Sequence, residues 1–172
     1  MKKAILSIWA LLALLTSVSV AYGKGSTDKI SIIGAGLARP LEITTPNTLE
    51  GFSPWGGEFF DHTRGNWGRL TETPTVTQTY NVFFYIRDNN NKPQLIYVFR
   101  YAFNPSSAQG YMYIPTEGEA WYVMNSATIA RPSGWYYANR EWDKFMRQVL
   151  ANKSEARLNA SLAQLLWGEV RR

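Results

Sequence analysis

The sequence contains no cysteine among its 172 residues, which excludes disulfide bonds and any thiol nucleophile. A chain without disulfides has to be stabilised by packing, by a metal ion or by a partner. Packing material is abundant, because 15% of the residues are aromatic. We therefore expect a self-sufficient core formed largely by aromatic side chains.

Histidine is almost as scarce, since His62 is the only one in the sequence. A zinc site usually draws on several His or Cys ligands, and a Ser–His pair would have to use this one imidazole. No serine lies in a Gly-x-Ser-x-Gly motif. The sequence therefore predicts neither a metal site nor a cofactor, and it supplies nucleophilic catalysis poorly.

The body of the chain also lacks a cluster of lysine and arginine. The formal net charge is +5, and it falls to +3 when Lys2 and Lys3 at the N-terminus are removed. A protein that follows a nucleic-acid backbone needs a basic patch or stripe. We expect no nucleic-acid binding, whereas a weak attraction to anionic cell-envelope polymers is compatible with this charge.

Long apolar runs are missing except at the N-terminus. Lys2 and Lys3 precede an apolar run over Ala4–Val18, and the small-x-small triplet 21–23 follows it, as in a secretory signal peptide. The uninterrupted part, Ala4–Leu15, is shorter than the roughly 20 residues of a membrane span, although an uncleaved anchor is the alternative. We predict a bacterial protein, secreted or periplasmic, with residues 1–23 cleaved after Gly23 and residues 24–172 forming one domain without a membrane span.

The centre of the predicted fold is a long hairpin. Thr77–Arg87 and Gln94–Asn104 alternate like strands, and the connector 88–93 is rich in turn-forming residues. Pairing Arg87 with Gln94 gathers apolar residues on one face, in the pairs Ile86–Leu95, Phe84–Tyr97, Val82–Phe99 and Tyr80–Tyr101. The oxygen donors of residues 88–91 leave a calcium site as an alternative to a solvated hairpin tip.

Further elements complete an α+β expectation. We predict short strands at 30–33 and 41–44, a helical turn from Pro46, and a second hairpin of Gly110–Ile114 with Glu119–Asn125, followed by a possible strand at 127–131. Asn139 is predicted to cap an amphipathic helix that buries Trp142, Phe145, Met146, Val149 and Leu150, and a last helix follows over 158–166. The predicted fold is an antiparallel sheet of five to seven strands, centred on the long hairpin and packed by one or two C-terminal helices.

Residues 34–39 (Gly-Ala-Gly-Leu-Ala-Arg) resemble the start of a dinucleotide-binding fingerprint. That motif needs a third small residue at the position of Arg39 and a helix whose N-terminal amides hold the pyrophosphate. Pro40 lies where the helix would run, and 41–44 alternate like a strand. A glycine turn between two short strands is the favoured interpretation.

The glycine-rich segment 55–68 holds the most varied chemistry. Glu58 and Asp61, with His62 beside them, form a possible carboxylate pair of the kind that glycosidases use. A local contact that ties the loop down, with Asp61 and His62 joined by Arg64, is the alternative.

Rings in loops next to glycine can be presented to a ligand, and flat sugar faces stack on such rings. The residues predicted to bind a ligand are Trp55, Trp67, Arg64, Trp135 and Tyr136, and a place for these rings in the core is the alternative.

Three functions remain open at this stage. The first is an exported, non-catalytic binding or interaction module for a cell-envelope glycan or an extracellular protein. The second is a small secreted hydrolase that acts on a glycan through Glu58 and Asp61. The third is a structural subunit of an exported assembly, suggested by the half-apolar second face of the hairpin around Phe83 and Val98.

Overall fold

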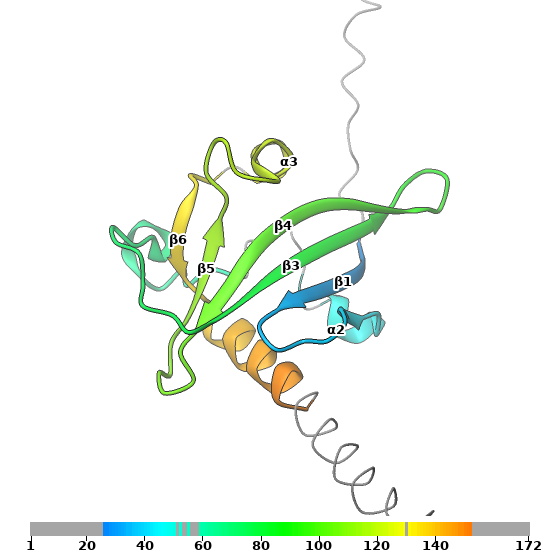
Figure 1. Cartoon of the computed structure of the whole chain (residues 1–172). Coiled ribbons are helices and arrows are strands. Elements are labelled where there is room, and N and C mark those ends of the chain that lie inside the picture. Colours follow the sequence, from blue (N-terminus) through cyan, green and yellow to red (C-terminus); the bar gives the residue numbers. More distant parts are fainter. Residues whose placement is uncertain (1–25, 51, 53–54, 56–58, 130, 153–172) are drawn as a thin grey trace, which may run out of the picture.

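A computed structural model of the chain describes residues 26–50, 52, 55, 59–129 and 131–152. Within this part, six strands form one antiparallel sheet in the order β2-β1-β3-β4-β5-β6. The strands are β1 (Thr27–Gly34), β2 (Leu41–Ile43), β3 (Gln78–Arg87), β4 (Pro93–Phe103), β5 (Gly110–Ile114) and β6 (Gly134–Tyr137). The helical segments are α2 (Pro46–Glu50), η1 (Gly65–Gly68), α3 (Tyr122–Thr128) and a helix over 140–152. A six-stranded antiparallel sheet with helices is the predicted α+β class (Figure 1).

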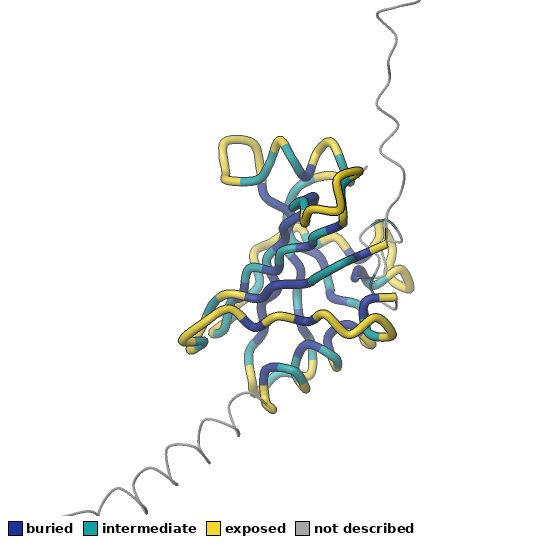
Figure 2. The backbone as a smooth tube through the Cα atoms, turned by 90° about the vertical axis from the view of Figure 1, so that its right-hand side faces the viewer, coloured by how far each residue is buried: buried dark blue, intermediate teal, exposed yellow. Residues whose placement is uncertain are grey.

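One face of the sheet is the core. β3 alternates strictly, so that Tyr80, Val82, Phe84 and Ile86 are buried while their neighbours are more exposed. The helix 140–152 lies across this face (Figures 1 and 2). Its Trp142 and Met146 side chains are fully buried in the core. Asn139 caps the helix as predicted, because its side-chain oxygen accepts a hydrogen bond from the Glu141 amide at 2.8 Å.

Asp143 is a charged residue of this helix that lies on its buried side. It is 7% exposed, and it accepts a hydrogen bond from the Tyr101 hydroxyl at 2.5 Å. Arg147 Nε lies 3.1 Å from both carboxylate oxygens. Burial and the Asp143 carboxylate raise the pKa of Tyr101, so this phenol is a proton donor at every physiological pH.

The pairing of β3 with β4 follows the predicted register for most of its length. Val82 lies opposite Phe99, Phe84 opposite Tyr97 and Tyr80 opposite Tyr101. A bulge then shifts the register between Phe84 and Tyr85, so the predicted pairs Arg87–Gln94 and Ile86–Leu95 are wrong by one residue.

The cause of the shift is a connector one residue shorter than predicted. The Asp88 carboxylate accepts hydrogen bonds from the Asn90 and Lys92 amides, and the Asp88 amide donates to Lys92 O. These bonds close the turn over residues 88–92 and place Arg87 opposite Pro93.

The second predicted hairpin is wrong. Residues 122–128 form α3 rather than a strand, and Trp121 precedes that helix with a left-handed φ of 67°. The partner of β5 is instead β6, so that Tyr111 lies opposite Tyr137 and Met112 opposite Tyr136. The interpretation of 127–131 as a strand is wrong for the same reason, because α3 extends to Thr128.

The helix α3 closes a free edge of β4. β5 pairs with only the last part of β4, from Arg100 to Phe103, which leaves the edge around Val98 without a strand partner. The Asn125 side chain takes that place: its oxygen accepts from the Val98 amide at 3.0 Å, and its NH2 donates to Val98 O. Thr128 adds a bond from its hydroxyl to Ile96 O at 3.0 Å. These bonds satisfy backbone groups that would otherwise invite another strand.

The predicted glycine turn joins β1 to β2. The Leu37 amide donates to Gly34 O at 2.9 Å, and a Cβ on Gly34 would lie 2.4 Å from Thr79 O. The chain then enters β2 instead of a helix, so residues 34–39 form no phosphate-binding helix N-terminus. β1 begins at Thr27, earlier than the strand expected at 30–33.

Two predictions concern residues outside the described part of the chain, namely the signal peptide 1–23 and the helix over 158–166. Among the described residues, no helix is long and apolar enough to cross a membrane.

Candidate functional site

The segment 59–70 runs along the free edge of β6. The Asp61 amide donates to Tyr137 O at 3.0 Å, and the Leu70 amide donates to Trp135 O at 2.8 Å. Isolated bridges join Phe60 to Ala138 and Arg69 to Tyr136. The predicted loop residues are therefore fixed beside β6, where Trp135 also lies.

Asp61 holds this loop in shape. Its carboxylate accepts bonds from the Thr63 hydroxyl and amide at 2.5 and 3.1 Å, and it pairs with Arg64 Nε at 2.9 Å. The predicted contact between Asp61 and Arg64 is confirmed. The Thr63 hydroxyl, the Thr63 amide and Arg64 together hold the pKa of Asp61 below its ordinary value of 3.8.

This depressed pKa predicts a pH dependence. Ionised Asp61 contributes stability that is fully present above pH 3.8 and is lost as the pH falls through the lower pKa of the folded state. We expect the Tm difference between wild type and Asp61→Asn, measured by circular dichroism, to be constant from pH 7 to 5 and to shrink below pH 3.8. A difference that grows on acidification would contradict this role.

Arg64 links the loop to the sheet. Its guanidinium carbon lies 3.8 Å from the centroid of the Tyr137 ring, and its NH2 group donates to Gln109 Oε1 at 3.1 Å. The bond from Arg64 Nε to Asp61 Oδ2 at 2.9 Å holds the guanidinium over the ring. Arg64 is thus placed on the sheet face opposite the core.

Trp67 is presented to solvent, as predicted, with 56% of its surface exposed. Both Asn66 and Trp67 adopt left-handed backbone angles, with φ of 53° and 58°. The His62 ring packs edge-on against Trp67 with 4.8 Å between centroids. A non-glycine pair in this conformation stores backbone strain, which the surrounding contacts must hold.

The other predicted site residues have different positions. Trp55 is partly buried and packs against the core, and Glu58 lies outside the described residues. Tyr136 is 1% exposed, and its hydroxyl donates to Pro132 O at 2.6 Å, so its ring belongs to the core and is removed from the site. Trp135 and Tyr136 lie in β6, so the prediction that they lie in a loop is wrong.

Four half-buried rings lie in two neighbouring pairs on the face of β5 and β6 that points away from the core. We name the aromatic strip by these residues: Tyr111, Tyr113, Trp135 and Tyr137. Cross-strand pairing places the ring of Tyr111 5.7 Å from Tyr137, and that of Tyr113 4.9 Å from Trp135. Of these four, only Trp135 was predicted to bind a ligand, and the three tyrosines were missed because β5 was assigned the wrong partner strand. Their signal is the two-residue spacing of aromatic residues in both strands.

Two arginines and a carboxylate frame the strip. Arg100, on β4, has its guanidinium carbon 5.0 Å from the centroid of Tyr113, as Arg64 has above Tyr137. Glu119 accepts hydrogen bonds from the Tyr113 hydroxyl at 2.5 Å and from the Thr116 amide at 2.6 Å. The rings are therefore fixed in orientation before any ligand arrives, which reduces the ordering cost of binding.

The strip lies between two hollows. One, of about 170 Å³, includes Tyr113, Arg100, Glu119 and Trp121 in its walls. The other, of about 360 Å³, is lined by Tyr111, Tyr137 and the segment 69–74. The strip thus joins two concave regions, an arrangement suited to an extended ligand rather than to a compact one.

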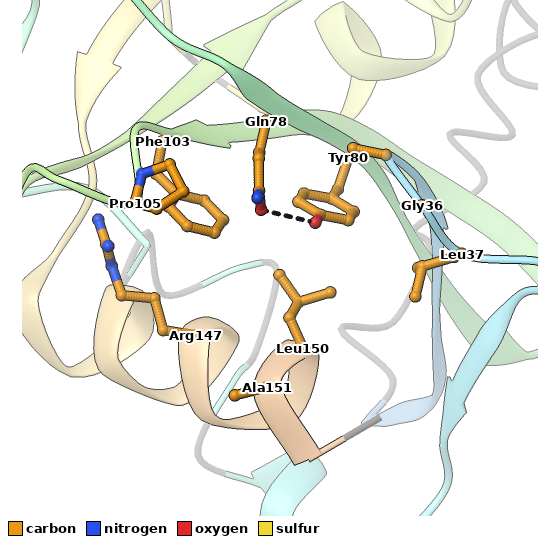
Figure 3. A pocket seen from close by; sticks show the side chains of 10 residues that line it. Gly36, Leu37, Gln78, Tyr80, Phe103, Pro105, Arg147, Leu150 and Ala151 are labelled. Carbon is orange, nitrogen blue, oxygen red and sulfur yellow. Dashed lines mark hydrogen bonds between the residues drawn. The ribbon is translucent and has the colours of Figure 1, made fainter. Parts of the chain in front are cut away.

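A third hollow, of about 470 Å³, lies at the end of the core between the β1–β2 turn, β3, β4 and the helix 140–152 (Figure 3). The Tyr80 hydroxyl in its wall donates to Gln78 Oε1 at 2.9 Å, and Arg147 pairs with Asp143, while the Arg147 Nη2 atom is buried without a partner among the described residues. Its rim ends at Ala151, next to the last described residue. For these reasons we place the candidate site on the aromatic strip.

No family model, curated protein or solved structure matches this chain. The site is therefore interpreted from its own chemistry: two tilted pairs of aromatic rings, two guanidinium groups and one carboxylate. Among residues 26–50, 52, 55, 59–129 and 131–152, no three His, Cys, Asp or Glu side chains gather in a way that could hold a metal ion.

Proposed function

We propose that this protein is an exported, non-catalytic binding module that holds an extended glycan of the cell envelope or extracellular space on the aromatic strip. The observation that carries the proposal is the pair of cross-strand ring contacts, Tyr111–Tyr137 and Tyr113–Trp135, on the face of β5 and β6 opposite the buried Met112 and Tyr136. Fixed aromatic rings with polar tips suit the alternating apolar faces and hydroxyl groups of sugars. Export rests on the N-terminal sequence, with residues 24–172 as the mature domain.

The charge of the site favours a ligand with hydrogen-bond acceptors or some negative charge. Arg64 and Arg100 stand above the rings at opposite ends of the strip. Their guanidinium groups present several N–H donors in a fixed plane, which match hydroxyl and carboxylate oxygens. The ligand class is therefore a neutral or acidic polysaccharide, in line with the weakly basic mature chain.

The observations favour this function over the two alternatives. The oxygens of Asp61 are engaged with Thr63 and Arg64, which suits a structural role in the loop. On the second face of β3 and β4, Phe83 packs against Trp121 with 5.5 Å between ring centroids, and the Lys29 ammonium lies over Tyr85. Intramolecular contacts thus cover much of the surface that suggested a structural subunit.

The test is retention of the full chain on immobilised polysaccharides and on isolated bacterial cell walls. We expect the double substitution Tyr113→Ala and Trp135→Leu to weaken retention about 100-fold, because each lost ring is worth roughly 1–2 kcal/mol at the centre of a binding surface. Trp67→Ala is the matched control, since it removes an exposed ring outside the strip. An equal loss of retention in the double variant and in Trp67→Ala would overturn the proposal. So would a wild-type chain that none of the polysaccharides or cell walls retains.

A further inference from the structure

Arg131 is a half-buried cation whose surroundings are aromatic. Its guanidinium carbon lies 4.3 Å from the centroid of Trp67 and 4.7 Å from that of Phe60. None of the ion pairs among the described residues includes it, and its Nη1 atom is buried there without a hydrogen-bond partner. The other arginine with a buried, unbonded nitrogen, Arg147, pairs with a carboxylate.

A guanidinium in this position is costly to maintain. Removing an ionised group from water without a counter-charge is unfavourable, and stacking on a ring returns only about 0.5–2 kcal/mol. Burial lowers the pKa of Arg131, but an arginine remains protonated at physiological pH. The folded chain therefore retains a positive charge that no described residue neutralises.

A small hollow of about 190 Å³ lies beside this charge and includes Arg131 in its wall. Tyr122 and Ser126 on α3, and Ser133 after Arg131, are among the lining residues, together with the apolar Ile114 and Ile129. The Ser126 hydroxyl donates to Val123 O at 2.9 Å, so Tyr122 and Ser133 are the residues that can offer a hydroxyl donor to a ligand. Hydroxyl donors around a guanidinium are the groups that bind an oxyanion. The volume suits one such group, not a large ligand.

We propose that this hollow is a binding site for an oxyanion, a carboxylate or a phosphate or sulfate group, held by Arg131 with the hydroxyl groups around it. The ring of Trp67 lies over the same guanidinium in a left-handed conformation, and strained residues of this kind gather at ligand sites. The site is separate from the aromatic strip, since Arg131 belongs neither to the strip nor to the two hollows beside it. It therefore stands independently of the proposed function.

The test measures Tm of the full chain against acetate, phosphate and sulfate at constant ionic strength, with chloride as the reference. A ligand that binds only the folded state at ten times its Kd should raise Tm by about 3–5 °C. The rise should disappear in Arg131→Met and be reduced in Arg131→Lys, which keeps the charge but loses the planar fork. A larger response to acetate identifies a carboxylate site, and a larger response to phosphate or sulfate identifies a tetrahedral one.

Arg87→Met is the matched control, because Arg87 lies outside both this hollow and the aromatic strip and its charge is paired with Asp28. It should keep the full response to the anion. An equal rise in wild type and Arg131→Met would show a general salt effect, and the absence of any rise in wild type would show that no site exists. Either of these two results would overturn the proposal.

Discussion

Replacing Trp142 with alanine is expected to lower the free energy of unfolding by about 4 kcal/mol, within the range for truncating a large buried aromatic residue. Trp142 is fully buried on the helix 140–152. The centroid of its ring lies 4.8 Å from that of Phe52, 4.9 Å from that of Phe59 and 5.7 Å from that of Phe99. Trp142 therefore connects the helix to Phe52 and Phe59, which come before η1 in the chain, and to strand β4 of the sheet. Denaturant unfolding followed by circular dichroism measures the loss, with Tm falling by about 10–15 °C.

Two controls separate packing from other effects. Trp67→Ala removes an exposed indole and should cost less than about 1 kcal/mol. Trp142→Phe keeps a ring in the core and removes an indole N–H that has no hydrogen-bond partner among the described residues, so it should cost clearly less than Trp142→Ala. A loss for Trp142→Ala no larger than that for Trp67→Ala would contradict the placement of this helix on the sheet.

Replacing Asn125 with alanine is expected to cost about 3 kcal/mol and to promote self-association. Asn125 is 1% exposed, and its amide group bonds both the N–H and the C=O of Val98. Without it, two buried backbone groups lose their partners, each at about 1–3 kcal/mol. The same two groups lie on an edge of β4 that could then pair with a strand of another molecule. Unfolding curves measure the first effect, and light scattering near the midpoint measures the second.

Asn125→Asp gives a finer test of this edge. A carboxylate can still accept a hydrogen bond from the Val98 amide, but it cannot donate to Val98 O, so the variant should remain less stable than wild type. Ser126→Ala changes the neighbouring exposed residue of α3 and should alter stability by less than about 0.5 kcal/mol. If Asn125→Ala were as stable and as monomeric as Ser126→Ala, the edge-capping role would be wrong.

Local alternation was enough to predict the pairing of β3 with β4 up to Phe84. The apolar residues of both strands repeat every second position, and a slip of one residue would have turned them to the wrong face. The bulge was not predictable in the same way. It depends on three hydrogen bonds to and from Asp88 that close a shorter turn than the composition of the connector suggests.

The segment 119–125 shows why the second hairpin was mispredicted. Its aromatic residues fit a strand, and a glycine-containing turn precedes it, so local preference favours pairing with β5. The structure instead forms α3, in which Asn125 and Thr128 bond the free edge of β4. Such bonds depend on the position of a strand far away in sequence, so tertiary structure overrides the local preference.

Only part of the candidate site was predictable, because the rest depends on which strand pairs with β5. Arg64 and Trp135 were identified because they lie near glycines, and both are found at the aromatic strip or beside it. Tyr111, Tyr113 and Tyr137 were missed, since a ring in a strand is assigned to the core unless its partner strand and its face are known. Correct pairing of β5 with β6 places them on the open face.

Hydroxyl-radical footprinting of the full chain, with and without the polysaccharide that retains it most strongly, tests the central claim most directly. Mass spectrometry then reports how fast each aromatic residue is oxidised. The account predicts protection of Tyr111, Tyr113, Trp135 and Tyr137, while Trp67 keeps its rate. Unchanged oxidation of these four rings, with protection elsewhere on the molecule, would show that the ligand binds another surface.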